Sequence, residues 1–298
     1  MKKYLFLPFC LIICGFANAQ QLLSELNNEQ RVIYEEHVFG GQPDNEKILI
    51  RNAYVVNYNT EWRIPNWCAY HITSDYLNTP ERKSRFKRFR DDPDIEKPVN
   101  ESEYDGLLSS LGYARGHYAP FKILGGDRDN DGTYAQLQGE SDEDDEITVF
   151  EGNYMSNIAP QLHYGFNGSG GLWFKTERWV QDKVVSDAVE VWEYSGGIIH
   201  DDRHIEKVGI NNDIAVPDQF YKVVIKKGEN EYPDVLVFLF PHNDHKDDVQ
   251  EKDIFKYLVS VDYLEAISGL DFFQDYSSSI QKQFESSVDI NAWAVFID

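Results

Sequence analysis

Apolar and polar positions alternate along several short stretches of the chain, and this pattern predicts β-strands. Residues 48–59 (ILIRNAYVVNYN) and 67–73 (WCAYHIT) are rich in β-branched and aromatic side chains. Residues 219–227 (QFYKVVIKK) and 235–241 (VLVFLFP) are apolar enough to be central strands of a sheet. We therefore expect the fold to be organised by a β-sheet.

Two other stretches have the spacing of amphipathic helices. From Gly171 onward, four residues recur at i, i+4, i+7 and i+11, which places them on one helix face. They are Trp173, Glu177, Val180 and Val184. Residues 262–273 (DYLEAISGLDFF) form the second stretch, and Gly269 is a suitable stop signal. Because strands dominate and helices are few, we expect an α+β fold with layers around an antiparallel sheet.

The start of the chain predicts a signal peptide. A basic MKK is followed by the short apolar run YLFLPFCLIICGF and by ANA before Gln20, which is typical of cleavage after Ala19. No later stretch is long and apolar enough for a membrane helix, and no Pro/Ser-rich linker divides residues 20–298. We expect one domain in an exported, periplasmic or secreted protein that does not contact a membrane. The sequence does not indicate its oligomeric state.

The charge balance is strongly acidic. Lysine and arginine number 28 against 51 aspartate and glutamate residues, which gives a formal net charge of −23. Such a chain cannot coat nucleic acid by general electrostatic attraction, although a local basic surface can still act at short range. One dense basic cluster interrupts the acidic background, and we interpret it as a surface that faces anions. It comprises Arg82, Lys83, Arg85, Lys87, Arg88 and Arg90. A solvated face is the ordinary alternative.

The segment YARGHYAP, residues 113–120, places Arg115 and His117 almost side by side. A neutral histidine can take a proton from water, and an arginine can bind a phosphate oxygen. Farther along the chain, Asn157, Asn167 and Glu177 offer an amide carbonyl or a carboxylate, the hard oxygen ligands that suit Mg²⁺. Glu177 interrupts an otherwise apolar helix face, where a carboxylate is costly unless it is paired or near a cation. Together these groups could perform metal-assisted phosphodiester hydrolysis.

Each of these residues also has an ordinary structural explanation when taken alone. A loop histidine is usually just a hydrogen-bonded side chain. The pair Asn167-Gly168 is a common turn. An isolated helical glutamate is usually a surface residue. Only the ordered set favours a catalytic interpretation.

In that order, the residues resemble the DNA/RNA non-specific endonuclease family. The resemblance is carried by GYARGHYAP, by SNIAPQ, and by the run from Asn167 through Trp173 to Glu177. Flanking stretches between residues 48 and 273 are also similar to the strands and helix of that family. The resemblance implies a ββα-metal active site, Mg²⁺ or Mn²⁺ as cofactor, and DNA and RNA as substrates contacted through their backbone phosphates. It also implies 5′-phosphate oligonucleotides as products.

The resemblance assigns a role to each candidate. His117 would be the general base, Asn167 the magnesium ligand and Arg115 a phosphate contact. Glu177 would orient water at the metal, and Asn157 would support the loop or His117. Ala114 stands where the family usually has aspartate. That departure keeps a second function open, namely a catalytically weakened nuclease fold that binds Ca²⁺ or an extracellular polymer.

The segment DRDNDG, residues 127–132, is a separate candidate site. Asp127, Asp129 and Asp131 occupy the first, third and fifth positions and a glycine the sixth, as at the start of an EF-hand calcium loop. The twelfth position is Gln138 rather than the usual glutamate. A structural Ca²⁺ site and a merely solvated acidic loop are both compatible with this pattern.

Overall fold

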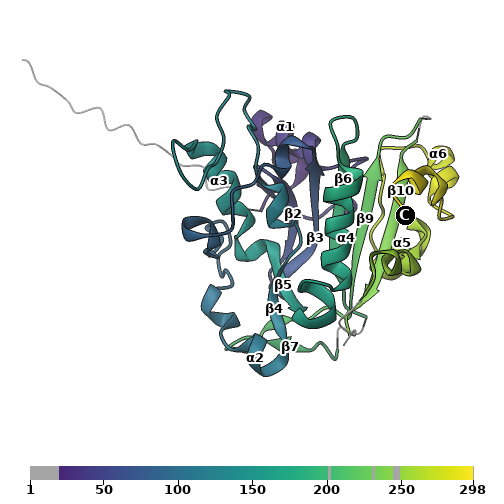
Figure 1. Cartoon of the computed structure of the whole chain (residues 1–298). Helices are drawn as coiled ribbons and strands as arrows, with labels where there is room; N and C mark the ends of the chain where they lie inside the picture. Colours follow the sequence, from purple (N-terminus) through teal and green to yellow (C-terminus); the bar gives the residue numbers. More distant parts are fainter. Residues whose placement is uncertain (1–19, 201–202, 230–231, 244–248, 298) are drawn as a thin grey trace, which may run out of the picture.

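A seven-stranded antiparallel sheet organises the described part of the chain (Figure 1). The computed structural model describes residues 20–200, 203–229, 232–243 and 249–297, so the expected signal peptide, residues 1–19, lies outside the described residues. The strand order is β1-β2-β3-β6-β9-β10-β11, and each neighbouring pair is antiparallel. The strands are β1 (Leu49–Arg51), β2 (Tyr54–Asn59), β3 (Ile64–Ile72), β6 (Val191–Ile198), β9 (Gln219–Lys226), β10 (Asp234–Pro241) and β11 (Leu258–Val259).

Two small antiparallel pairs accompany this sheet. They are β4 (Tyr113–His117) with β5 (Ile158–Leu162), and β7 (Lys207–Val208) with β8 (Ile214–Ala215). The helices are α1 (Asn28–His37), α2 (Leu107–Leu111), α3 (Glu143–Gly152), α4 (Leu172–Trp179), α5 (Val261–Ser268) and α6 (Ser278–Phe284). Short helical turns connect them: η1 (Leu23–Glu25), η2 (Asp75–Leu77), η3 (Ser84–Lys87), η4 (Glu101–Tyr104), η5 (Phe121–Ile123), η6 (Met155–Asn157), η7 (His163–Asn167), η8 (Val180–Val184), η9 (Glu251–Tyr257) and η10 (Asn291–Phe296).

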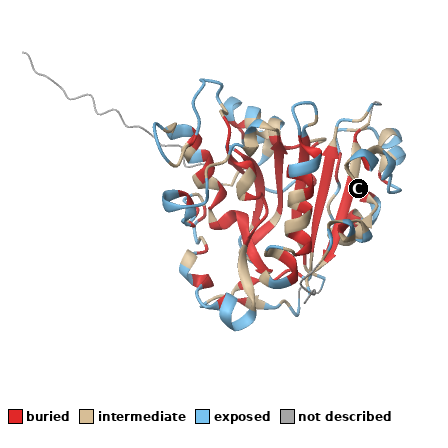
Figure 2. Cartoon of the chain, viewed as in Figure 1, coloured by how far each residue is buried: buried red, intermediate tan, exposed pale blue. Residues whose placement is uncertain are grey.

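The large sheet is buried on both faces (Figure 2). Successive residues of a strand point to opposite faces, so Cys68 and Tyr70 of β3 contribute to one core and Trp67 and Ala69 to the other. The first core contains the apolar side of α4 together with β4 and β5, and the second is covered by α1 and α5. These layers confirm the α+β class with an antiparallel sheet. None of the described helices has the length and apolar composition needed to span a membrane.

The predicted elements are present, with two differences in detail. The stretch 48–59 forms two strands, β1 and β2, because the chain turns between them. Helix α4 ends at Trp179 and continues as the wider turn η8, although Val180 and Val184 remain fully buried as their spacing predicts. Gly269 ends α5 with φ +73°, a left-handed conformation that glycine adopts readily.

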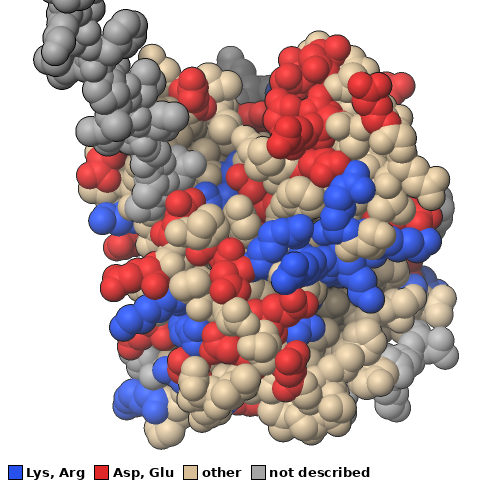
Figure 3. All heavy atoms as spheres, turned by 90° about the vertical axis from the view of Figure 1, so that its left-hand side faces the viewer, with Lys and Arg blue, Asp and Glu red and all other residues tan. Residues whose placement is uncertain are grey.

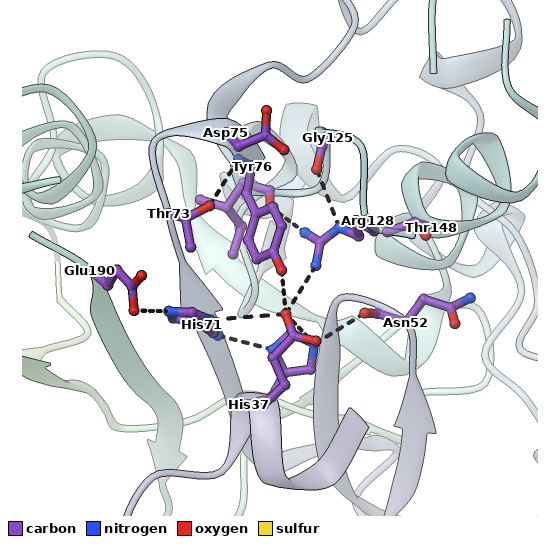
Figure 4. Close-up of polar contacts among 12 residues, drawn as sticks. His37, Asn52, His71, Thr73, Asp75, Tyr76, Gly125, Arg128, Thr148 and Glu190 are labelled. Atoms are coloured by element: carbon purple, nitrogen blue, oxygen red, sulfur yellow. Dashed lines mark hydrogen bonds and ion pairs between the residues drawn. The ribbon is translucent and has the colours of Figure 1, made fainter. Parts of the chain in front are cut away.

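A partly buried polar cluster ties α1 to β3, η2 and the loop after η5 (Figure 4). The carboxylate of Glu36 accepts a 2.5 Å hydrogen bond from the Tyr76 hydroxyl and lies 3.9 Å from both His71 Nδ1 and the Arg128 guanidinium. Burial disfavours the ionised carboxylate, but the electrostatic interactions with His71, His37 and Arg128 and the hydrogen bond from Tyr76 outweigh it. They lower the pKa of Glu36 to about 2.

We predict that Glu36→Gln destabilises the protein at pH 7 but not in strong acid. The folded pKa is below the ordinary value of 4.5, so the stabilisation is present above pH 4.5 and is lost as the pH falls toward 2. The melting temperature should drop by roughly 2–6 °C at pH 7. Melting curves between pH 2.5 and 7 test this, with Glu35→Gln, an exposed neighbour on α1, as the control. If the difference in melting temperature between the parent and Glu36→Gln stayed constant from pH 7 to pH 2.5, the low pKa of Glu36 would be contradicted.

Candidate active site

The Arg-Gly-His segment lies on β4, directly beside the Ser-Asn-Ile-Ala-Pro-Gln segment. In the β4–β5 register, Arg115 faces Pro160, Gly116 faces Ala159 and His117 faces Ile158. Helix α4 follows β5 through the turn η7, so these two strands and one helix form a ββα unit on one face of the large sheet (Figure 1). Residues that are about forty positions apart in sequence therefore meet across one pair of strands.

His117 is held as a neutral imidazole. Its side chain is buried, and its Nε2 lies 3.2 Å from Asn153 Oδ1. Asn153 Nδ2 donates to the carbonyl of Phe86, which identifies Oδ1 as the end of the amide that faces His117. The imidazole therefore donates from Nε2 and keeps its lone pair on Nδ1. Burial lowers the pKa of His117 to about 3, and the positive charge of Arg82 acts in the same direction.

Asn157 lies beside the site as a structural anchor. Its side chain is fully buried. The Oδ1 atom accepts from the Ala119 backbone at 2.8 Å, and Nδ2 donates to the carbonyls of Ala119 and Gly152, both at 2.9 Å. The amide thus joins the end of β4 to the end of α3. Since all these partners are backbone atoms, Asn157 holds the loop, and Asn153 is the residue that contacts His117.

Position 116 must be glycine because the Gln161 side chain packs directly against its Cα. Gln161 of β5 is fully buried and passes over the glycine, so that a Cβ at position 116 would lie 2.1 Å from Gln161 Oε1. The same Oε1 accepts a hydrogen bond from Asn167 Nδ2. This contact orients the Asn167 amide and leaves its carbonyl oxygen available as a ligand. Gln161 belongs to the motif SNIAPQ, but the sequence alone does not indicate its role, because the contact with Gly116 forms only when β4 and β5 pair.

Glu177 is half-buried on α4, one turn after Trp173. Burial raises the pKa of Glu177 to about 7, the charge of Glu193 raises it further, and the charge of Lys222 opposes both. Lys222 Nζ lies 4.2 Å from the centroid of the Trp173 ring. The turn η7 packs on the same helix, because Phe166 stacks on Trp173 at 5.8 Å. Asn167, the next residue, is thereby positioned beside α4.

Lys222 is a buried cation that the sequence analysis did not single out. It projects from β9, and its Nζ donates to Tyr70 at 2.8 Å and to Glu193 and Ser195 at 3.1 Å each. All four side chains are buried on the sheet. A cation without water needs such partners. The positive charge of Lys222 in this network lowers the pKa of Glu177.

A basic pocket adjoins His117. Its volume is about 510 Å³, and its lining is Arg82, Ser84, Lys87, Arg88, Phe89, Glu101 and Arg115. The ring of Phe89 contacts the His117 ring at 5.5 Å and supports the guanidinium groups of Arg82 at 4.7 Å and Arg115 at 5.3 Å. Figure 3 shows lysine and arginine side chains gathered on this face, beside a group of acidic side chains.

The members of the predicted basic cluster are not equivalent. Arg85 is paired with Glu146 of α3 and also donates to the carbonyl of Gln136. Lys87 and Arg88 are exposed at the pocket. Arg115 donates to the carbonyl of Glu101 at 2.9 Å and lies 3.3 Å from Asp105. These contacts fix the Arg115 guanidinium at the pocket wall.

The donor set fits a hard divalent cation. Asn167 offers an amide carbonyl, and the half-buried carboxylate of Glu177 has a raised pKa that a nearby cation would lower. One or two oxygen donors, with water completing the shell, are typical of Mg²⁺ sites. Nitrogen and sulfur donors, which Zn²⁺ prefers, do not dominate here. The loop aspartates Asp127, Asp129 and Asp131 gather elsewhere, with one carboxylate oxygen from each lying within 4.8 Å of the others.

Comparisons with known proteins agree with this geometry. A family model described as DNA/RNA non-specific endonuclease matches residues 36–279. The chain is 28% identical to nuclease C1 of Cunninghamella echinulata var. echinulata over 243 residues, which covers 79% of this chain and 86% of that protein. It is 27% identical to a nuclease of Serratia marcescens, covering 80% of this chain and 79% of that one.

A solved structure has the same fold. It comes from work described as the crystal structure of the EndoG/EndoGI complex and the mechanism of EndoG inhibition. The matched chain has a TM-score of 0.63 and 21% identity, and the match covers 86% of this chain and 96% of that one. With the family match, these findings show that the chain belongs to the DNA/RNA non-specific endonuclease family.

We predict that Gly116→Ala destabilises the protein only while Gln161 is present. Forcing a methyl group into a packed contact typically costs about 1–3 kcal/mol. In a Gln161→Ala background the obstruction is gone, so the same change should cost less than about 0.5 kcal/mol. Urea unfolding of the parent, the two single variants and the double variant measures the effect of Gly116→Ala on the free energy of unfolding in each background. If Gly116→Ala lowered the free energy of unfolding equally with and without Gln161, the glycine would not be required by the packing of that side chain.

Proposed function

We propose that this member of the DNA/RNA non-specific endonuclease family is an exported, Mg²⁺- or Mn²⁺-dependent enzyme that hydrolyses phosphodiester bonds of both DNA and RNA. The observation that supports this best is the state of His117. It is a neutral base with a fixed tautomer, next to a basic pocket and on the same ββα unit as Asn167 and Glu177. Export is proposed from residues 1–19 alone, by their resemblance to a signal peptide.

The residues of the chain divide the chemistry between them. Arg115 and Arg82 hold a phosphate oxygen at the pocket. His117 Nδ1 accepts a proton from water while the water oxygen forms a bond to phosphorus. The bond from phosphorus to the 3′ oxygen breaks, the 3′ oxygen takes up a proton, and the phosphate stays on the 5′ side. Asn153 keeps the imidazole in the tautomer that this transfer needs.

Asn167 would hold the divalent cation, and Glu177 would orient water beside it. When bound, the cation stabilises the negative charge of the phosphoryl transition state and of the leaving oxygen. Gln161 orients the Asn167 amide through its hydrogen bond. The positive charge of Lys222 opposes the rise in the pKa of Glu177 and so favours its ionised form.

Substrate breadth follows from what the pocket offers. Its cationic side chains, Arg82, Lys87, Arg88 and Arg115, suit phosphate oxygens, which carry no base identity. Attack by water needs no 2′-hydroxyl group. Both DNA and RNA can therefore be substrates, and we expect oligonucleotides with 5′-phosphate ends.

Cleavage of plasmid DNA and single-stranded RNA with Mg²⁺, with and without EDTA, tests the proposal. We predict that EDTA abolishes cleavage and that His117→Ala lowers the rate by about 10²–10⁴-fold at an unchanged fold. Asn167→Ala should raise the Mg²⁺ concentration needed for half-maximal rate more than Asn157→Ala does. If His117→Ala folds and still cleaves at the parental rate, His117 is not the general base. Binding of DNA without any cleavage by the parent would favour a catalytically weakened binding protein.

The charge distribution generates a further prediction about salt. Two effects of salt compete: it screens repulsion between the acidic protein and the substrate, and it screens attraction at the pocket. Screening acts over roughly 8–10 Å near physiological ionic strength, so the long-range repulsion is lost first. We expect the cleavage rate to pass through a maximum at moderate NaCl. Changing Arg82, Lys87 and Arg88 together to glutamine should abolish most activity.

Arg85→Gln is the matched control for that triple variant. Arg85 belongs to the same basic cluster but is already paired with Glu146, so its loss should change the initial rate little. Rates are measured against NaCl at fixed Mg²⁺ for the parent and both variants. A parental rate that only falls from the lowest salt upward, with the triple variant behaving identically, would overturn the argument.

A further inference from the structure

The loop Asp127–Gly132 is shaped by its own carboxylates. Asp127 accepts hydrogen bonds from the backbone of Asp131 at 3.0 Å and of Gly132 at 2.8 Å, and this folds the loop around the three aspartates. Arg128, the basic residue inside the loop, does not neutralise them. Its guanidinium donates to the carbonyls of Ile123 and Gly125 and lies 3.7 Å from the centroid of the Tyr76 ring.

A fourth carboxylate reaches this loop from α3. Asp145 is 5% exposed, and its Oδ1 accepts from the backbone N–H of Arg128, between Asp127 and Asp129, at 3.3 Å. Its Oδ2 is buried and has no hydrogen-bond partner among the described residues. A buried carboxylate oxygen with no donor is costly unless it binds a cation.

We propose that Asp127, Asp129 and Asp131, whose carboxylate oxygens lie within 4.8 Å of one another, hold one Ca²⁺ ion, and that Asp145, which contacts the loop backbone, completes the site. Asp145 replaces the acid that an EF-hand loop carries at its twelfth position, which is Gln138 here. Several carboxylates with room for carbonyl and water ligands suit Ca²⁺ better than Mg²⁺, which keeps most of its waters. The ion relieves the repulsion among the loop aspartates and gives Asp145 Oδ2 a partner.

The site is anchored on its inner side by the polar cluster of α1. Figure 4 shows Arg128 pointing from the loop toward Tyr76 and the histidine pair His37 and His71. Glu36 lies 3.9 Å from the Arg128 guanidinium. In addition, Asp75 Oδ2 accepts from the Asp127 backbone at 3.1 Å. The loop is therefore fixed to the domain before any cation binds, which reduces the entropy that binding must overcome.

Helix α3 connects this site to the catalytic histidine. Asp145 lies in its first turn, and Gly152 and Asn153 lie at its end. Gly152 accepts from Asn157, and Asn153 contacts His117. The first turn carries four acidic residues, Glu143, Asp144, Asp145 and Glu146. Glu146 is already paired with Arg85, but without a cation the repulsion between the other three and the loop loosens the start of the helix, and the position of Asn153 becomes less defined. This coupling rests on the proposed nuclease function, whereas the calcium site does not.

The first experiment tests the site by itself. Full-length protein is stripped with EGTA, and its melting temperature is followed as Ca²⁺ or Mg²⁺ is added. A Ca²⁺ excess of about 100-fold over Kd should raise the melting temperature by roughly 5–10 °C, with one Ca²⁺ per chain by calorimetric titration. Asp145→Asn keeps the shape and the acceptor for Arg128. It should melt at or above the parent without Ca²⁺ and gain little when Ca²⁺ is added.

The control for that experiment is the second carboxylate cluster of the described chain, formed by Asp262, Glu265 and Glu285. Glu265→Gln should leave the response to Ca²⁺ intact. No melting shift in the parent, or an unchanged shift in Asp145→Asn, would overturn the proposed site. A shift lost only in Glu265→Gln would place the ion in the other cluster and overturn it as well.

The second experiment tests the coupling at millimolar Mg²⁺ and micromolar Ca²⁺. Removing Ca²⁺ with EGTA should lower kcat at least about threefold at unchanged KM, since Arg82, Arg88 and Arg115 at the pocket do not depend on α3 for their charge. In Asn153→Ala, kcat should no longer respond to Ca²⁺. An equal kcat with and without Ca²⁺ in the parent would overturn the coupling. Absence of any cleavage, together with an intact melting shift, would refute the nuclease function and leave the calcium site standing.

Discussion

The active site depends on the buried amide of Asn157. Its Oδ1 and Nδ2 are fully used by the backbone of Ala119 and Gly152, and its own carbonyl accepts from the Tyr118 backbone at 3.0 Å. Three segments therefore meet at one side chain: the end of β4, the start of β5 and the end of α3. Because a buried amide that loses its partners is costly, these segments cannot shift independently. The position of His117 follows from that restraint.

Sequence patterns predicted the parts of the structure that are encoded locally. The strands around Val56 and Phe238, the buried face of α4 and the stop at Gly269 each follow from neighbouring residues. The DNA/RNA non-specific endonuclease family was recognisable because its motif residues keep their order along the chain. The contacts of those residues could not be predicted, because their partners are distant in sequence and come close only in the folded chain. Arg85 was assigned to an anion-binding surface, yet Glu146, far along the chain, already neutralises it.

The environment of Lys222 is a second feature that could not be predicted from neighbouring residues. In the stretch QFYKVVIKK the charge of Lys222 alone favours solvent exposure, but it is fully buried. Its partner Glu193 lies on β6, the strand paired with β9, and its partner Tyr70 lies on β3, the next strand beyond β6. Glu177 approaches the same network from α4. Two carboxylates then share one lysine, and the remaining negative charge favours a cation on the open side of Glu177. The excess of negative charge in the sheet interior thus favours cation binding at the proposed metal site.

The burial of His117 sets a requirement on how it can act as a base. With a pKa of about 3, the imidazole is neutral at physiological pH but holds a proton weakly. A general base is most effective when its pKa lies near the working pH. The positive charge of Arg82, one cause of the low pKa, faces the pocket where a phosphate would bind. A bound phosphodiester offsets that charge and raises the proton affinity of the imidazole. In the proposed mechanism the basicity of His117 would therefore increase when substrate is present, and the same arginine would both bind the phosphate and make the base responsive to it.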